Sequence, residues 1–234
     1  MKNEIAILMA AGLGSRMRPL TERIPKPLVP VGDTPMIETV IAGLKRRSVQ
    51  DIYIVVGYLG EKFRYLEEKY DNVHLVENRE YDRVNNISSI YAVSHILGNA
   101  DCFICEADLY VMDASIFDAE LTQSCYFGKM VEGYSDDWVF TMDQERIIHI
   151  GKGGSDTYNM TGIAYFKQED AKKIAAGVLT TYRKGGYEEL FWDEVVDSML
   201  DELKLTIYPV TGEQIVEIDT LTELEQMRFR LQGI

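Results

Sequence analysis

Residues 8–28 read LMAAGLGSRMRPLTERIPKPL, and this stretch decides how the rest of the chain is interpreted. The apolar run that leads into it, Ile5–Met9, predicts a buried β-strand. The small side chains of residues 10–15 let backbone N–H groups approach an anion closely. The cations Arg16, Arg18 and Lys26 follow, and the prolines on either side of Lys26 stiffen the chain around it. The stretch therefore predicts a loop that holds phosphate groups.

Three other interpretations of this loop are weaker. Gly12 and Gly14 suit the start of a dinucleotide-binding turn, but that turn needs a third glycine and an immediate helix, whereas Arg16 and Pro19 follow here. A P-loop needs Gly-Lys-Ser/Thr after four spacer residues, and the sequence does not contain it. An ordinary glycine turn flanked by solvated basic residues is the third alternative.

The stretch resembles the signature of the sugar-nucleotidyltransferase-like superfamily, which is an apolar strand, Ala-Ala-Gly-x-Gly-Ser-Arg-x-x-Pro-Leu-Thr, and then Pro-Lys-Pro-Leu. The resemblance implies that the glycine loop, with Gly14, wraps a nucleoside triphosphate. It also implies that Arg16 grips the β- and γ-phosphates and that Lys26 neutralises charge at the reacting phosphates, so both are candidate catalytic residues. Ala10, Ala11 and Gly12 are expected near the ribose and the base.

Composition limits the classes of partner. The chain has 234 residues, 46% of them hydrophobic, which suits one α/β domain with a sizeable core. A net charge of −14 argues against nucleic acid as a partner. No apolar run approaches membrane-spanning length, and the three cysteines follow no disulfide framework. We therefore expect a cytoplasmic protein that acts on small molecules and has no nucleic-acid or membrane partner.

Strand and helix signals alternate through the first half of the chain. Predicted strands at 52–56, 73–76 and 102–105 alternate with helical stripes at 36–44, 63–70 and 87–97. This order predicts an α/β fold with a Rossmann-like, doubly wound, mostly parallel mixed sheet. The resemblance specifies the nucleotide-diphospho-sugar transferase type.

The second half of the chain mixes its signals. Strands are predicted at 125–130, 139–142, 147–150, 163–166, 205–208 and 215–218, and helices at 168–176 and 191–200. Thr220 and Glu223 form a candidate capping box for a last helix. We expect one nucleotidyltransferase domain over 1–234, with a lid-like acceptor-binding region within about 120–200 over the carboxyl edge of the sheet.

Two aspartates follow predicted strands. Asp108 comes after the strand at 102–105, and Asp219 comes after Ile215–Ile218. Nucleotidyl transfer needs Mg²⁺ to neutralise the triphosphate, and one or two carboxylates commonly hold this ion. With 38 acidic residues in the chain, position alone does not single out a pair. The superfamily resemblance does, because its metal aspartates fall at these two landmarks. Strand alternation places Glu106 on the same side as Asp108, so Glu106 is expected to support the metal through water.

Shorter motifs resemble the bacterial phosphocholine cytidylyltransferase family. They are the Asn-Asn-x-x-Ser-x-Tyr stretch at 85–91, Glu106-Ala107-Asp108, the pair Asp137-Trp138, the triplet Phe191-Trp192-Asp193 and Glu217-Ile218-Asp219. Trp138, Glu189, Trp192 and Asp193 are therefore candidate acceptor-binding residues, because a trimethylammonium group needs aromatic faces and carboxylates. Gly57, Asn86 and Ser89 are candidates for reading the base. Alternatively, the tryptophans pack in a core or lid, and Asn85 and Asn86 cap the following helix.

The resemblance implies that CTP and phosphocholine react with Mg²⁺ to give CDP-choline and pyrophosphate. A cytidylyltransferase for 2-aminoethylphosphonate or another phospho-amine is the first alternative, and a sugar-1-phosphate nucleotidyltransferase is the second. A catalytically inactive nucleotide-binding regulator is the alternative outside enzymes, and the joint presence of Lys26, Asp108 and Asp219 argues against it. The sequence does not fix the oligomeric state.

Overall fold

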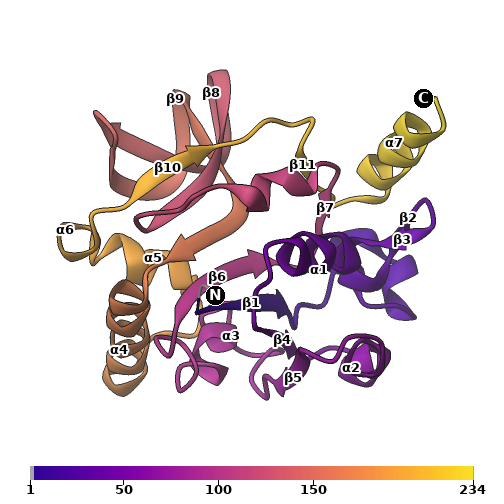
Figure 1. Ribbon diagram of the computed structural model, residues 1–234, viewed down its shortest axis with the longest axis horizontal. Helices are drawn as coiled ribbons and strands as arrows, with labels where there is room; N and C mark the ends of the chain where they lie inside the picture. The colour runs from indigo at the N-terminus through magenta and orange to yellow at the C-terminus, as the bar shows by residue number, and fades with distance from the viewer. Residues whose placement is uncertain (1–2, 234) are drawn as a thin grey trace.

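A computed structural model describes residues 3–233 of the chain. Its main sheet has the order β10-β8-β9-β6-β1-β4-β5, with two small two-stranded sheets beside it (Figure 1). The strands are β1 (Glu4–Ala10), β2 (Pro30–Val31), β3 (Thr34–Pro35), β4 (Asp51–Val56), β5 (Val73–Glu77), β6 (Asp101–Glu106), β7 (Leu109–Val111), β8 (Cys125–Asp143), β9 (Arg146–Phe166), β10 (Thr206–Pro209) and β11 (Ile215–Glu217). The α-helices are α1 (Met36–Arg46), α2 (Arg64–Lys69), α3 (Ile87–Ala92), α4 (Gln168–Lys184), α5 (Trp192–Asp197), α6 (Leu200–Leu203) and α7 (Leu221–Gln232).

Strand β1 lies between two hydrophobic cores because successive side chains of a strand point to opposite faces. Ala6 and Leu8 pack with the apolar stripe of α1 in one core. Ile5 and Ile7 pack with residues of α3, α4 and α5 in the other. The sheet is thus covered by helices on both faces, which explains why β1 reads as a continuous apolar run.

The parallel strands define the edge at which ligands bind. Strand β1 pairs in parallel with β4 on one side and with β6 on the other. The chain passes from β1 through α1 to β4 and β5, and later places β6 on the opposite side of β1. Ligands in open α/β sheets bind at such a reversal of strand order, outside the carboxyl ends of the strands. The predicted Rossmann-like, doubly wound, mostly parallel mixed sheet is confirmed.

The second half of the chain builds a long antiparallel hairpin that extends the sheet. The strands predicted at 125–130 and 139–142 are parts of the single strand β8, and those at 147–150 and 163–166 are parts of β9. The polar residues between them escaped prediction because this part of the hairpin lies outside the core, where no apolar alternation is required. In Figure 1 the hairpin and β10 gather at the end of the molecule away from α2 and β5.

Several other boundaries differ from the expectation. Helix α4 continues past Ala176 to Lys184, and Gly185, with a φ of 78°, follows its last residue. The helix predicted at 191–200 divides into α5 and α6. The capping box of Thr220 and Glu223 opens α7 as predicted. Cys102 and Cys105 are free thiols that point into different cores. Among the described residues, no helix is long and apolar enough to cross a bilayer.

Candidate active site

A cleft of about 590 Å³ opens where β1 and β6 end. The loop after β1 lines one part of it, and the residues that follow β6 and β11 line another. The segment 78–89, the β8–β9 hairpin and the turn before α5 complete the lining. Of the predicted site residues, the cleft brings together Ala10, Ala11, Gly12, Gly14, Arg16, Lys26, Asn86, Ser89, Asp108, Trp138 and Asp219.

Gly14 is required where the phosphate loop folds back on itself. Its φ of 59° lies in the left-handed region that favours glycine, and a Cβ there would lie 2.9 Å from the Cβ of Lys26. The Thr21 hydroxyl donates a hydrogen bond of 2.8 Å to the Gly14 carbonyl and ties the two sides of the loop together. The glycine therefore permits Lys26 to approach the loop that was predicted to hold phosphate.

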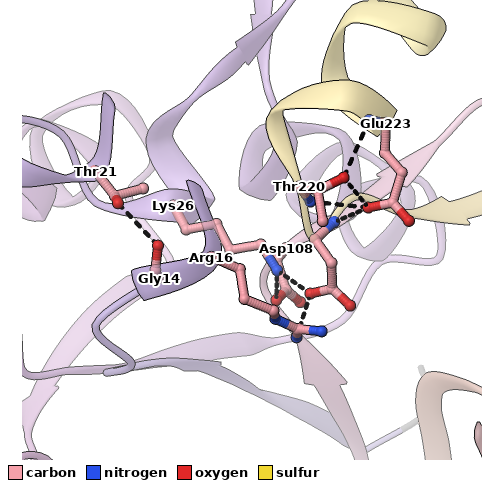
Figure 2. A network of polar contacts seen from close by, with 8 residues as sticks. Gly14, Arg16, Thr21, Lys26, Asp108, Thr220 and Glu223 are labelled. Atoms are coloured by element: carbon pink, nitrogen blue, oxygen red, sulfur yellow. Dashed lines mark hydrogen bonds and ion pairs between the residues drawn. The ribbon is translucent and has the colours of Figure 1, made fainter. Parts of the chain in front are cut away.

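Lys26 lies at the centre of a compact charge network, shown in Figure 2. Its Nζ lies 2.6 Å from Asp108 Oδ2 and 2.5 Å from Asp219 Oδ1, and Arg16 Nη2 lies 2.6 Å from the same Asp219 oxygen. Only 7% of Lys26 is exposed. Burial opposes its charge, but the two aspartates outweigh burial and raise the pKa of Lys26. Lys26 is therefore a fixed cation at neutral pH.

The N-terminus of α7 fixes the backbone of Asp219. Glu223 Oε2 accepts hydrogen bonds of 2.8 Å from the backbone N–H groups of both Asp219 and Thr220. Figure 2 shows Thr220 and Glu223 beside the charge network. The capping box thus holds an aspartate of the site in place as well as closing the helix end.

Three carboxylates gather next to Lys26. Oxygens of Glu106, Asp108 and Glu217 lie within 4.8 Å of one another. Burial and then Asp108 raise the pKa of Glu106, and the same two causes raise the pKa of Glu217 to about 8. Asp108 Oδ1 is buried without a hydrogen-bond partner in the described structure. The carboxylates outnumber the cations beside them, and one of their oxygens has no partner. Such a group of oxygen ligands suits a divalent cation such as Mg²⁺.

This cluster differs in part from the predicted metal pair. Asp108 belongs to it, whereas the bonded oxygen of Asp219 faces Lys26 and Arg16. Glu106 contributes directly to the cluster, where a supporting role through water was expected. Glu217 was not predicted at all. The sequence feature that could have identified Glu217 is its position two residues before Asp219, because Glu106 stands two residues before Asp108 in the same way.

Most of the residues predicted to bind the nucleotide line the cleft, but Gly57 does not. The ring of Tyr81, which does line the cleft, covers Gly57 so closely that a Cβ there would lie 2.5 Å from it. Asn86 Oδ1 accepts a hydrogen bond of 3.0 Å from the backbone N–H of Trp192. Ser89 Oγ accepts one of 3.3 Å from Asn78 Nδ2. Asn86 therefore connects the start of α3 to the start of α5.

The other end of the cleft carries an aromatic pair. Trp138 on β8 meets Phe191 edge to face, with ring centroids 5.2 Å apart. Lys152 on β9 pairs with Trp138 across the hairpin, and its Nζ lies 5.7 Å from the centroid of Trp138 and 5.8 Å from that of Phe191. Asp137, whose side chain accepts a hydrogen bond from the Trp138 backbone N–H, also lines the cleft. Lys152 escaped prediction because an isolated lysine in a polar hairpin gives no sequence signal.

The other three predicted acceptor residues lie outside this cleft. Trp192 is 3% exposed and packs against Tyr126 and Phe166, with ring centroids 6.1 and 6.0 Å away. Asp193 is equally buried and accepts a hydrogen bond of 2.9 Å from the Tyr126 hydroxyl, and burial raises its pKa to about 7. The Glu189 side chain is exposed, and its backbone carbonyl accepts from Asn85 Nδ2.

The physical reason is the turn into α5. Phe191 is the last extended residue before the helix and lines the cleft, whereas Trp192 begins the helix and turns into the core beneath it. Of the triplet Phe191-Trp192-Asp193, Phe191 therefore lines the cleft, whereas Trp192, the residue predicted to bind the acceptor, packs in the core.

Cations facing carboxylates at the switch point of a doubly wound sheet are typical of enzymes that handle nucleoside triphosphates. Residues 6–151 match the model of the MobA-like NTP transferase domain. The chain therefore belongs to the MobA-like NTP transferase family and is a nucleotidyltransferase.

The relatives that cover nearly the whole chain include two cytidylyltransferases of 35% identity or more. A 2-aminoethylphosphonate cytidylyltransferase of Lancefieldella rimae is 53% identical over 220 residues, covering 94% of this chain and 89% of the relative. A choline-phosphate cytidylyltransferase of Streptococcus pneumoniae is 35% identical, covering 97% of this chain and 98% of the relative. The solved CTP:phosphocholine cytidylyltransferase from Streptococcus pneumoniae superposes with a TM-score of 0.90 at 35% identity, over 98% of this chain and 99% of that one.

Proposed function

We propose that this enzyme transfers the cytidylyl group of CTP to 2-aminoethylphosphonate and releases pyrophosphate. The observation that carries the proposal is the 53% identity, over nearly the whole chain, to a cytidylyltransferase for that acceptor. The choline-phosphate relative is more distant, at 35% identity. The comparisons thus favour the first sequence-based alternative over the phosphocholine reaction.

The proposed reaction requires no protein nucleophile. An oxygen of the acceptor phosphonate attacks the α-phosphorus of CTP, a new P–O bond forms, and the bond to the β-phosphate breaks with pyrophosphate as the leaving group. Phosphoryl-type oxygens are already ionised near neutral pH, so a general base is not needed. Catalysis then rests on positioning and on stabilisation of charge.

The residues divide the work along the cleft. The backbone of the glycine loop, with Arg16 and Lys26, binds the triphosphate oxygens, and Lys26 stabilises the charge that develops in the transition state. Asp108, assisted by Glu106, Glu217 and Asp219, would hold Mg²⁺. When bound, that ion supplies charge neutralisation of the triphosphate and of the departing pyrophosphate.

At the acceptor end, a primary ammonium has N–H donors and is best bound by carboxylates, whereas a trimethylammonium group has none. Asp137 offers such a carboxylate in the cleft beside Trp138. Phosphocholine remains the second candidate acceptor because Trp138 and Phe191 present aromatic faces there, and because the phosphocholine enzyme superposes over nearly the whole chain.

A matrix of substrates tests the proposal. CTP, UTP, GTP and ATP are each combined with 2-aminoethylphosphonate, phosphocholine, phosphoethanolamine or glucose 1-phosphate, and pyrophosphate release is measured with and without Mg²⁺. We expect the highest kcat/KM for CTP with 2-aminoethylphosphonate, and loss of activity when EDTA removes the metal. A higher kcat/KM for phosphocholine or a sugar phosphate would overturn the choice of acceptor. Nucleotide binding without pyrophosphate release in any combination would identify a regulator instead.

A further inference from the structure

The aromatic pair at the acceptor end already has a cation of the protein over it. The Lys152 ammonium lies 5.7 and 5.8 Å from the centroids of Trp138 and Phe191, within the range in which a cation is attracted to a ring face. Lys152 reaches this position because it is the cross-strand partner of Trp138 in the β8–β9 hairpin. One lysine thus contacts both aromatic walls, which come from different parts of the chain.

This arrangement affects two kinds of acceptor differently. A trimethylammonium group depends on aromatic faces for recognition, so it would have to displace Lys152 or bind beside a like charge. A primary ammonium binds through N–H donors and can use Asp137 without entering the aromatic pair. The side chain of Lys152 therefore disfavours one acceptor class more than the other, which is what specificity requires.

We infer that Lys152 is a specificity-determining residue, whose ammonium occupies the Trp138–Phe191 pair and selects primary amines over quaternary ammonium acceptors. The inference rests on the proposed function, because it explains how a cleft with aromatic walls would prefer 2-aminoethylphosphonate. It assigns to Lys152 no contact with the nucleotide and no part in the chemical step.

The test is Lys152→Met, which removes the charge but keeps an unbranched side chain that can cover the rings. The values of kcat/KM for 2-aminoethylphosphonate and phosphocholine are measured with saturating CTP and Mg²⁺. We expect the preference for 2-aminoethylphosphonate to fall about tenfold, the factor that one contact of this kind can supply. The change should come mainly from a lower KM for phosphocholine.

Two controls separate the charge at this position from general effects. Lys152→Arg retains a cation that can lie over aromatic rings and should keep the wild-type preference. Lys129 lies on the same hairpin but does not line the cleft, so Lys129→Met removes an equal charge elsewhere and should change nothing. Tryptophan fluorescence provides a readout of binding alone, because phosphocholine should perturb Trp138 more strongly in Lys152→Met than in the wild type.

Each remaining outcome decides the inference. An unchanged preference in Lys152→Met overturns it. A loss of activity with 2-aminoethylphosphonate and no gain with phosphocholine also overturns it, because Lys152 would then be a ligand of the acceptor. A wild-type enzyme that prefers phosphocholine refutes the proposed function by itself. The response of phosphocholine KM to Lys152→Met still decides separately whether Lys152 opposes quaternary ammonium groups.

Discussion

The two ends of the cleft are held in place differently. At the phosphate end, Lys26 is buried between Asp108 and Asp219, and Glu223 fixes the backbone of Asp219. At the proposed acceptor end, Asp137 and Lys152 are exposed residues of the hairpin. The register of the hairpin shifts between Ser135 and Trp138, next to these side chains.

This difference indicates a division of labour. Charge stabilisation in catalysis needs groups that are already in place before the reaction, and the phosphate end has them. Discrimination between acceptors needs side chains that can vary without damage to the sheet, and those stand on the hairpin. Substitutions at the two ends should therefore affect different measurements.

The largest effect is expected from Trp192→Ala, which tests whether Trp192 belongs to the core or to the acceptor site. Loss of this buried ring should lower the free energy of unfolding by about 3–5 kcal/mol, measured by chemical denaturation. The KM for the acceptor should not change in the fraction that remains folded. Trp138→Ala is the matched control and should do the reverse, raising the KM for phosphocholine, which depends on aromatic faces, with little loss of stability. A stable Trp192→Ala variant with a raised acceptor KM would return Trp192 to the acceptor site.

The next effect is expected at the phosphate end. Lys26→Ala should lower kcat about 10²–10³-fold, because it removes a charge donor that is already in position. Steady-state kinetics with a fixed excess of both substrates measures this loss. Lys69→Ala removes a lysine that pairs with Glu38 on α1, outside the cleft, and should leave kcat unchanged. An unaltered kcat in Lys26→Ala would exclude Lys26 from the mechanism.

The acidic cluster should respond through its requirement for metal. Asp108→Asn and Glu217→Gln are each expected to raise the Mg²⁺ concentration for half-maximal activity by about tenfold or more. The double variant should show less than the sum of the two effects in free energy, because both carboxylates serve one ion. Activity is followed during a Mg²⁺ titration. Strict additivity would indicate two independent roles.

The smallest effect concerns the pH dependence of stability. Burial raises the pKa of Asp193 from an ordinary value near 3.8 to about 7. The folded state therefore prefers the protonated form, and this contribution to stability is complete below about pH 4 and is lost as the pH rises through 7.

Asp193→Asn does not ionise, so its stability should not fall as the pH rises, and the asparagine oxygen can still accept a hydrogen bond from the Tyr126 hydroxyl. Relative to the wild type, its Tm should rise by about 2–4 °C between pH 6 and pH 7, which corresponds to about 1 kcal/mol. Thermal melts across this range measure the difference. A Tm difference that is independent of pH would show that Asp193 is ionised throughout.

The part of the site that could be predicted lies where local sequence determines geometry. The glycine loop, Asp108 and Asp219 stand just after strands, at one edge of the sheet, and the superfamily signature singled out Lys26 and these two aspartates. The two cores were predictable from the alternation of side chains along β1, because Ile5 and Ile7 point to one face of the sheet and Ala6 and Leu8 to the other.

The acceptor end could not be predicted in this way. Phe191 and Trp192 are adjacent, and only the backbone conformation at the start of α5 decides which ring faces the cleft. Lys152 meets Trp138 through a register that is specified by the hairpin and its bulges, not by spacing along the chain. Side chains that meet through such long-range pairing leave no local pattern in the sequence.

The attachment of the hairpin has a consequence for how this enzyme can diversify. Strand β9 joins β6 over Ile163–Phe166, and just before this, at Gly162, a Cβ would lie 3.2 Å from the Cβ of Glu106. Gly162, with a φ of 77°, therefore fixes the point at which the hairpin leaves the sheet, and the segment 129–160, which carries Trp138 and Lys152, lies beyond it. A graft of this segment from a relative should transfer the acceptor preference of that relative, while the host enzyme keeps its own Lys26 and acidic cluster. Gene duplication followed by drift in one hairpin would then be enough to give a new pathway its own activated building block.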